Sequence, residues 1–211
     1  MVEFNSGRTT CSSDRHASLT ASLSLNGTQV RCYDVASMSI TAFVVKVPGA
    51  EPLVSGLRDR FDATTKLGVP AHITLLIPFM AIDAVTADVV KRAQRALDAT
   101  PAFSFSLATV GRFPTTAYLG PEPATPFIAM TQALVGAFPD FLPYGGLHQG
   151  SVPHLTVAHG DAEEANEAAD ALQILLRQRG PVVSVCSSIS LLENSSGRWR
   201  ESHVFDLRGA A

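Results

Sequence analysis

The sequence has 211 residues, with 46% hydrophobic and 17% charged side chains and a formal net charge of −3. A chain of this length forms one large domain or two small lobes with a sizeable core. The weak negative charge offers no broad basic surface and argues against sustained binding of long nucleic acid, although a local group of arginines can still hold a small phosphate ligand. No apolar run reaches the length of a membrane span, so no membrane partner is expected.

Three cysteines, Cys11, Cys32 and Cys186, form neither a metal-ligand pattern nor a disulfide framework. Unpaired thiols of this kind are typical of a reducing compartment. We therefore expect a cytoplasmic protein, and we expect it to be a monomer.

Residues 1–37 differ in composition from the rest of the chain. Eleven of them are Ser or Thr, they show no apolar periodicity, and they lack the hydrophobic segment of a secretion signal. Two interpretations stay open: a disordered leader, or a start of translation at Met38. In both, the folded domain covers residues 38–211.

The first half of this domain predicts five elements from apolar runs, alternation and helical spacing. In chain order they are a strand at 39–47, a helix at about 51–61, a strand within Val69–Phe79, a helix that Asp83 caps, and a strand at 103–113. The second half repeats this order with a strand at 117–119 closed by Gly120-Pro121, a helix from Thr125 and a strand within Val152–Ala158. The next helix begins with an Asp161–Glu164 capping box and ends at Gly180. A closing hairpin of 182–192 with 199–207 follows.

The repeated order of elements predicts two similar lobes, at about 38–114 and 115–211, related by a pseudo-twofold axis. The third element of each lobe would lie near this axis. We expect the faces of these two strands to line one shared cleft.

Each of these two strands carries a histidine with a threonine two positions later: His72 with Thr74, and His154 with Thr156. Side chains alternate between the faces of a strand, so the members of each pair point the same way. An imidazole beside a hydroxyl combines a proton-transfer group with a hydrogen-bond donor for an anion. The alternative is a pair of core histidines, with threonine chosen for its strand propensity.

Two histidines on either side of a phosphodiester can serve as general base and general acid in one step. The unperturbed histidine pKa of about 6.5 places both protonation states within reach near neutral pH. The threonine hydroxyls would hold the non-bridging oxygens as charge develops. Such a reaction requires no metal and no other cofactor.

The stretches Gly68–Phe79, Val110–Pro114 and Pro153–Ala158 resemble a bacterial branch of the two-histidine (2H) phosphoesterases, the 2′-5′ RNA ligase-like superfamily. The resemblance covers residues 38–207. It implies a mixed α/β (α+β-like) fold, duplicated in two lobes, with central antiparallel-rich sheets and outer helices. It also implies that His72 and His154 are catalytic, and that Thr74 and Thr156 bind phosphate.

The same resemblance implies a substrate class. Members act, typically without metal, on 2′,3′-cyclic phosphates or 2′-5′ linkages, so the expected partner is a nucleotide or a short RNA end. Whether hydrolysis or ligation is physiological stays open, and so does the choice of acid and base between the two histidines. The alternative from another functional class is a non-catalytic module that binds a nucleotide or RNA end with the same fold.

Four further residues are candidates for substrate contacts. Arg112 can reach a phosphate, and three aromatic residues can stack on a base: Tyr144, Trp199 and Phe79. For each of them, packing or solvent exposure is an equally ordinary explanation. No sequence motif of a serine hydrolase elbow or of an ATP-binding phosphate loop is present.

Overall fold

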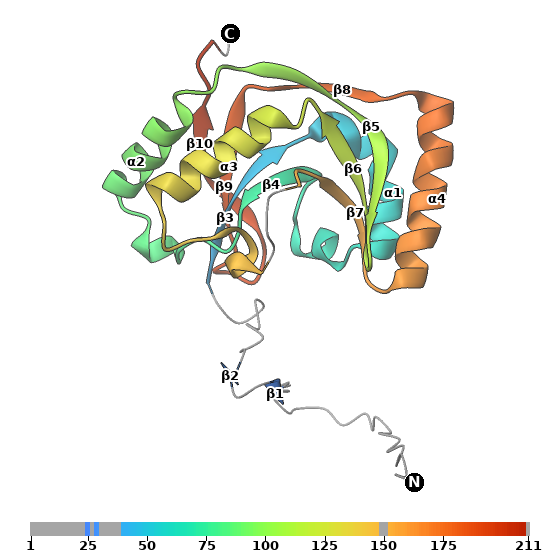
Figure 1. Ribbon diagram of the computed structural model, residues 1–211, viewed down its shortest axis with the longest axis horizontal. Helices are drawn as coiled ribbons and strands as arrows, with labels where there is room; N and C mark the ends of the chain where they lie inside the picture. The colour runs from blue at the N-terminus through green and yellow to red at the C-terminus, as the bar shows by residue number, and fades with distance from the viewer. Residues whose placement is uncertain (1–23, 26–27, 30–38, 148–151, 210–211) are drawn as a thin grey trace. The chain divides into compact units, whose positions relative to one another are not determined.

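The computed structural model describes residues 24–25, 28–29, 39–147 and 152–209 (Figure 1). The chain divides into two units, Met1–Val35 and Ala36–Ala211. In the first unit, β1 (Ser24–Leu25) pairs antiparallel with β2 (Thr28–Gln29). The rest of the predicted leader and the alternative start Met38 lie outside the described residues, so both interpretations of this segment stay predictions.

The second unit contains eight strands and four α-helices within the described ranges. Its strands are β3 (Thr41–Lys46), β4 (His72–Leu76), β5 (Phe103–Phe113), β6 (Thr116–Glu122), β7 (Leu155–His159), β8 (Val182–Cys186), β9 (Ser188–Glu193) and β10 (Arg200–Asp206). Its helices are α1 (Glu51–Phe61), α2 (Ala87–Leu97), α3 (Thr125–Ala137) and α4 (Ala162–Arg179). The predicted alternation of strands and helices is confirmed.

The eight strands form one sheet in the order β10-β9-β3-β4-β7-β6-β5-β8, and every neighbouring pair is antiparallel. The two strands that begin at the His-x-Thr motifs, β4 and β7, are the middle pair. They meet at the register pair Ile73 and Leu155. The predicted antiparallel-rich fold with central motif strands is therefore confirmed.

The closing hairpin was predicted with one strand over 182–192, and this is wrong. The segment is two strands, β8 and β9, separated by Ser187 alone. β8 pairs with β5 at one edge of the sheet, whereas β9 lies next to the opposite edge. Because one residue joins strands so far apart in the sheet order, the sheet curls until its two ends approach each other; in Figure 1, β5 and β8 arch above the middle strands.

Each half of the sheet takes strands from both halves of the sequence. β9 and β10 lie beside β3 and β4, while β5 lies with β6, β7 and β8. The helices follow the same exchange, because α1 packs against β7 and α3 packs against β4. The repeat in element order is thus interleaved in space, and the residue ranges of the two lobes stay a prediction.

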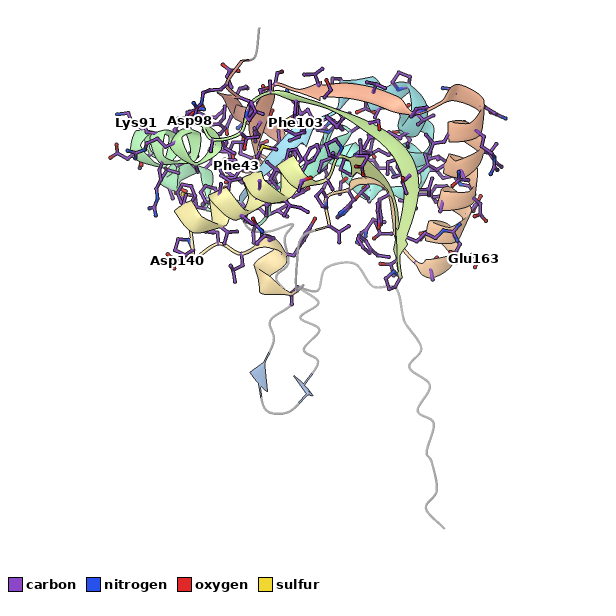
Figure 2. All side chains as sticks on the ribbon, turned by 45° about the horizontal axis from the view of Figure 1, so that its top comes forward. Phe43, Lys91, Asp98, Phe103, Asp140 and Glu163 are labelled. Carbon is purple, nitrogen blue, oxygen red and sulfur yellow. The ribbon has the colours of Figure 1, made fainter. Side chains whose placement is uncertain are left out.

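The helices pack in two pairs, α2 with α3 at one end of the sheet and α1 with α4 at the other (Figure 1). Between them and the sheet lies the main core, with fully buried Phe43, Ile73 and Leu155 on the strands. Figure 2 shows Phe43 in the middle of the fold, while Lys91 and Glu163 lie at its periphery. The covered face of the sheet is therefore apolar.

Two predicted element ends need correction. Asp83 lies in a short 3-10 turn, and Thr86 caps α2 instead, its side chain accepting a hydrogen bond from the Val89 amide. β6 does not end at Gly120 but continues to Glu122. The capping box of Asp161 and Glu164 at α4 is confirmed, as is the end of α4 before Gly180.

Candidate active site

The structure brings the two His-x-Thr pairs together on one face of the two middle strands. Ile73, paired with Leu155, points into the core and is completely buried, so its neighbours His72 and Thr74 point to the other face, where both are half-buried. Continuing the antiparallel register by one residue in each direction places His72 beside Thr156 and Thr74 beside His154. The face opposite the core therefore carries a compact group of two imidazoles and two hydroxyls.

Both imidazole rings are held by the same local hydrogen bond. Nδ1 of His72 lies 2.8 Å from the Pro70 carbonyl, and Nδ1 of His154 lies 2.7 Å from the Val152 carbonyl. A carbonyl oxygen can only accept, so Nδ1 carries the proton in both rings. The lone pair of the neutral ring is consequently on Nε2, which is the atom left for proton transfer.

A chain of hydroxyls adjoins His72. Its Nε2 lies 3.1 Å from Thr74 Oγ1, and the Tyr144 hydroxyl is hydrogen-bonded to Thr74 as well. Tyr144 adopts a left-handed backbone conformation with φ of 53°, and its amide donates to the Ile77 carbonyl at 2.6 Å. A non-glycine residue in this region is uncommon and is held there by its surroundings. The loop after α3 thus delivers Tyr144 to the end of β4.

His154 has aromatic neighbours instead. The ring centroids of Phe113 and Tyr118 each lie 5.2 Å from that of His154, and 4.6 Å from each other. Tyr118 is the cross-strand partner of both Gly111 on β5 and Thr156 on β7. A Cβ at position 111 would lie 2.2 Å from the Tyr118 ring, so only glycine leaves room for this ring beside His154. The sequence interpretation missed Phe113 and Tyr118; glycine opposite an aromatic residue on a paired strand is the signal that could have revealed them.

The electrostatic environment favours neutral imidazoles. The pKa of His72 is lowered to about 4, mainly by burial; the charges of Arg58 and His154 also lower it, whereas the Pro70 carbonyl and Asp62 raise it. Burial also lowers the pKa of His154, against the effect of the Val152 carbonyl. The influence of His154 on His72 shows that the two rings are close enough for their charges to interact.

Tyr144 has an altered acidity too. Burial raises the pKa of its hydroxyl, while the hydrogen bond with Thr74 opposes this change. The Tyr144 hydroxyl is therefore protonated throughout the neutral range and remains a hydrogen-bond donor. This donor lies next to the Thr74 hydroxyl.

Trp199 is half-buried on the same face of the sheet as the histidines. It packs against a small apolar cluster that contains Ala42, Val44 and Leu192. Val44 is the cross-strand partner of Thr74. This cluster places the indole on the opposite side of the histidine pair from Phe113 and Tyr118.

Two candidates are not brought to the site. Arg112 follows Gly111 on β5 and points to the other face, where its guanidinium binds Asp170 and lies 3.2 Å from the Asn166 side chain on α4. Phe79 is 2% exposed, packed among other phenylalanines with ring centroids at about 5 Å. Alternation along β5 and burial after β4 explain why neither residue reaches a ligand on the histidine face.

Comparison with known proteins agrees with this geometry. The model of the 2′-5′ RNA ligase superfamily matches residues 46–198, a range that contains both His-x-Thr motifs. The chain belongs to this superfamily. Its members are phosphoesterases and ligases, which supports an enzyme of this general kind. A search of curated proteins finds no match.

Solved structures with low sequence identity share the fold. One described as a phosphoesterase is 17% identical over 81% of this chain and 98% of its own, with a TM-score of 0.51. LigT of E. coli complexed with 3′-AMP is 17% identical over 80% of this chain and 98% of its own, also with a TM-score of 0.51. LigT in its apo form is 18% identical, with coverages of 81% and 98% and a TM-score of 0.50. Among the residues of this chain that the structure describes, none of the helices could span a membrane.

Proposed function

We propose that this protein is a metal-independent phosphodiesterase that uses His72 and His154 to cleave a 2′,3′-cyclic phosphate or a 2′-5′ phosphodiester of a nucleotide or RNA end. The observation that carries the proposal is the pairing of the two histidines on adjacent strands. Both rings share one face, and both are fixed through Nδ1 to a backbone carbonyl. This arrangement leaves two Nε2 atoms for the two proton transfers of a phosphodiester cleavage.

The cyclic phosphate gives the simplest reaction. The neutral imidazole takes a proton from water as the water oxygen forms a bond to phosphorus. The protonated imidazole gives its proton to the 2′ or 3′ oxygen as the bond from that oxygen to phosphorus breaks. The product is a phosphomonoester, and exchange of one proton with solvent returns both histidines to their starting states.

A 2′-5′ linkage follows the same proton path with a different nucleophile. The neighbouring 3′ hydroxyl attacks phosphorus, the 5′ oxygen leaves with the proton from the acid, and a 2′,3′-cyclic phosphate is formed. The reverse of this step joins a 5′ hydroxyl to a cyclic phosphate. One site can therefore carry out cleavage and ligation, with the direction set by the concentrations of the reactants.

Three hydroxyls support the phosphate in this proposal. Thr74 and Thr156 lie beside the histidines, and the Tyr144 hydroxyl is bonded to Thr74. Hydroxyl donors aimed at the non-bridging oxygens stabilise the charge that develops on them in the transition state. Tyr144, first considered as a base-stacking residue, is better suited to this donor role because of its contact with Thr74.

Aromatic side chains on both sides of the histidine pair support a nucleotide as substrate. Phe113 and Tyr118 lie against His154, and Trp199 lies beside the strand that pairs with Thr74. Stacking on aromatic rings is a common and sequence-tolerant way to hold a base. The structure of LigT with 3′-AMP, a member of the same superfamily, is consistent with this substrate class.

The test is an activity screen in excess chelator with 2′,3′-cyclic mononucleotides, 2′-5′ dinucleotides and RNA that ends in a cyclic phosphate. We expect turnover of at least one of these classes, and loss of that turnover in the His72→Ala/His154→Ala double variant. Ligation is tested by supplying RNA with a 5′ hydroxyl together with the cyclic-phosphate end. Saturable binding of these compounds without any turnover would support the non-catalytic binding module and overturn the proposal.

A further inference from the structure

A buried arginine lies next to the segment that leads into β4. Arg58, on α1, is 1% exposed. Its guanidinium donates to Asp62 from Nε at 3.2 Å and from Nη2 at 3.1 Å, and Nη2 also donates to the Val69 carbonyl at 3.0 Å. One planar group therefore holds both a carboxylate and a backbone oxygen in the interior.

A second acidic residue, Glu51 on α1, binds the same segment. Glu51 Oε1 accepts from the Ala71 amide at 2.6 Å and lies 3.8 Å from Arg58 Nη1. The residues bound by this cluster, Val69 and Ala71, flank Pro70, whose carbonyl accepts from His72 Nδ1. The charge cluster is thus connected to the His72 ring through the backbone on both sides of a single proline.

Stability alone is a weak reason to bury this cluster. Removing charged groups from water carries a large penalty, and apolar residues of similar volume are often as stable or more stable in their place. Arginine is also the one side chain whose fixed fork can bind a carboxylate and a carbonyl at the same time.

We propose that Arg58 is a positioning residue for His72, which fixes the Val69–Ala71 segment and through it the orientation of the imidazole ring. The ring orientation matters because a small displacement of a catalytic group lowers the rate steeply. The kinetic part of this inference rests on the proposed function; the geometric part does not.

Arg58 also acts on His72 through its charge. A cation nearby disfavours the protonated ring, and it lowers the pKa of His72, while the Asp62 anion raises it. His154, which directly precedes β7, is close enough to His72 to lower its pKa. On β3, Lys46 is the cross-strand partner of His72, and its ammonium group lies 2.5 Å from Glu201.

The remaining polar groups around His72 belong to the hydroxyl chain. Thr74 lies at Nε2, and Tyr144, with its pKa raised by burial, stays uncharged near neutral pH. Substitution of Arg58 by a neutral side chain therefore removes one cation and leaves Asp62 without its ion-pair partner. Both changes favour the protonated imidazole.

The first experiment measures the His72 ring directly, by NMR of ¹⁵N-histidine-labelled full-length protein. In Arg58→Met we expect the His72 titration midpoint to rise by about one pH unit. Arg58→Lys keeps the charge and should leave the midpoint near that of the parent. Arg60→Met is the matched control: it removes an arginine of the same helix that is exposed and paired with Glu167 at 2.8 Å, and should leave His72 unchanged.

A second variant guards against misfolding of Arg58→Met, in which Asp62 is buried alone. The double substitution Arg58→Met/Asp62→Asn removes both charges and should melt cooperatively. We expect its kcat to fall roughly 10- to 100-fold with little change in KM, and the NMR signal of the His72 Nδ1–H hydrogen bond to weaken. Arg58→Lys should recover part of kcat.

A folded Arg58→Met variant with the parental His72 tautomer and midpoint would overturn the inference, and so would a double variant with the parental kcat. The NMR measurements need no substrate. A protein that turned over none of the tested phosphodiesters would therefore refute the proposed function and still leave the role of Arg58 at His72 decided by the spectra.

Discussion

The two halves of the candidate site hold their histidines by the same bond and surround them differently. On β4, His72 is linked through Pro70 to the buried charges of Arg58 and Asp62, and its Nε2 touches a chain of hydroxyls. Directly before β7, His154 lies against two aromatic rings, and no hydrogen bond to its Nε2 is found among the described residues. A repeated motif therefore gives one backbone geometry but two chemical environments.

This difference affects which ring can act as the acid and which as the base. The neutral form is strongly favoured at His72, whose pKa is about 4, and less strongly at His154, where burial also lowers the pKa. Two groups with separated pKa values are what an acid–base pair needs.

Removal of either imidazole should have the largest effect. His72→Ala and His154→Ala should each lower kcat/KM by about 10²–10⁴-fold, the usual contribution of a general acid or base. Their effects should not multiply in the double variant, because both act in one concerted step. His203→Ala, an exposed histidine on β10, is the control and should change nothing.

Melting temperatures of the same variants show whether the residues serve chemistry or the fold. Little change is expected in either single His→Ala variant. Extensive unfolding of one of them would support the alternative that the histidine in that half of the site is a core residue. A double variant that retains normal turnover would contradict the proposed roles altogether.

Removal of a hydroxyl should lower the rate less than removal of an imidazole. Tyr144→Phe and Thr74→Val each break the hydroxyl chain at His72. Each should cost about 1 kcal/mol, or about fivefold in kcat/KM, the value of one neutral hydrogen bond. Thr156→Val removes the corresponding hydroxyl on β7. If Thr74→Val and Tyr144→Phe lower the rate together no more than separately, the chain acts as one unit.

The pH dependence of kcat/KM should be bell-shaped and displaced to the acidic side. The limb at lower pH should lie near the His72 pKa of about 4, and the limb at higher pH should lie below the ordinary histidine value of 6.5. A profile centred above pH 7 would contradict these environments. The profile should be unchanged by chelator.

Folding stability should follow the same groups with a defined sign. The unfolded chain binds a proton at His72 below pH 6.5, whereas the folded chain does so only near pH 4. Stability should therefore be complete above pH 6.5 and fall as the pH decreases from 6.5 to 4, by at most about 3 kcal/mol from this residue. Denaturant titrations of His72→Asn should show a flatter dependence, and His154→Asn a smaller change.

The smallest effect is expected at Arg112. Its guanidinium faces α4, where it binds Asp170 at the surface. Arg112→Gln should leave kcat/KM unchanged and reduce stability by about 0–1 kcal/mol, as for other exposed ion pairs. A selective rise in KM for phosphate-containing substrates would show instead that Arg112 turns to the histidine face when substrate is bound.

Local sequence patterns were sufficient for much of the fold and for the centre of the site. Apolar runs and caps gave most strands and helices, and strand alternation placed His72 with Thr74 and His154 with Thr156. These properties depend on residues two to four positions apart. They could be read without knowledge of the tertiary structure.

The surroundings of the histidines depend on contacts that local patterns do not encode. Phe113 and Tyr118 reach His154 only because β5, β6 and β7 are neighbours in the sheet. Arg58 lies on the buried side of α1 with Val54 and Phe61, although its charge is typical of an exposed position. The division of 182–192 at Ser187 was also hidden, because no glycine or proline marks it.

The line along which β4 and β7 meet, called the seam below, has a consequence for local motion. These strands share the single register pair Ile73 and Leu155, whereas β5 and β6 are paired from Ser106 to Phe113. The seam therefore has the sparsest cross-strand hydrogen bonding between neighbouring strands in the described part of the sheet. Local opening events in proteins occur preferentially where such support is low.

The proposed substrate would span this seam, with Thr74 on one strand and Thr156 on the other. A bound phosphate would then connect β4 and β7 where few cross-strand hydrogen bonds connect them. Amides of β4 and β7 should exchange with solvent faster than those of β5 and β6 in the free protein, and slow down when the ligand binds. Because β4 and β7 are sparsely paired, the site is the part of the sheet where a bound ligand can suppress local opening.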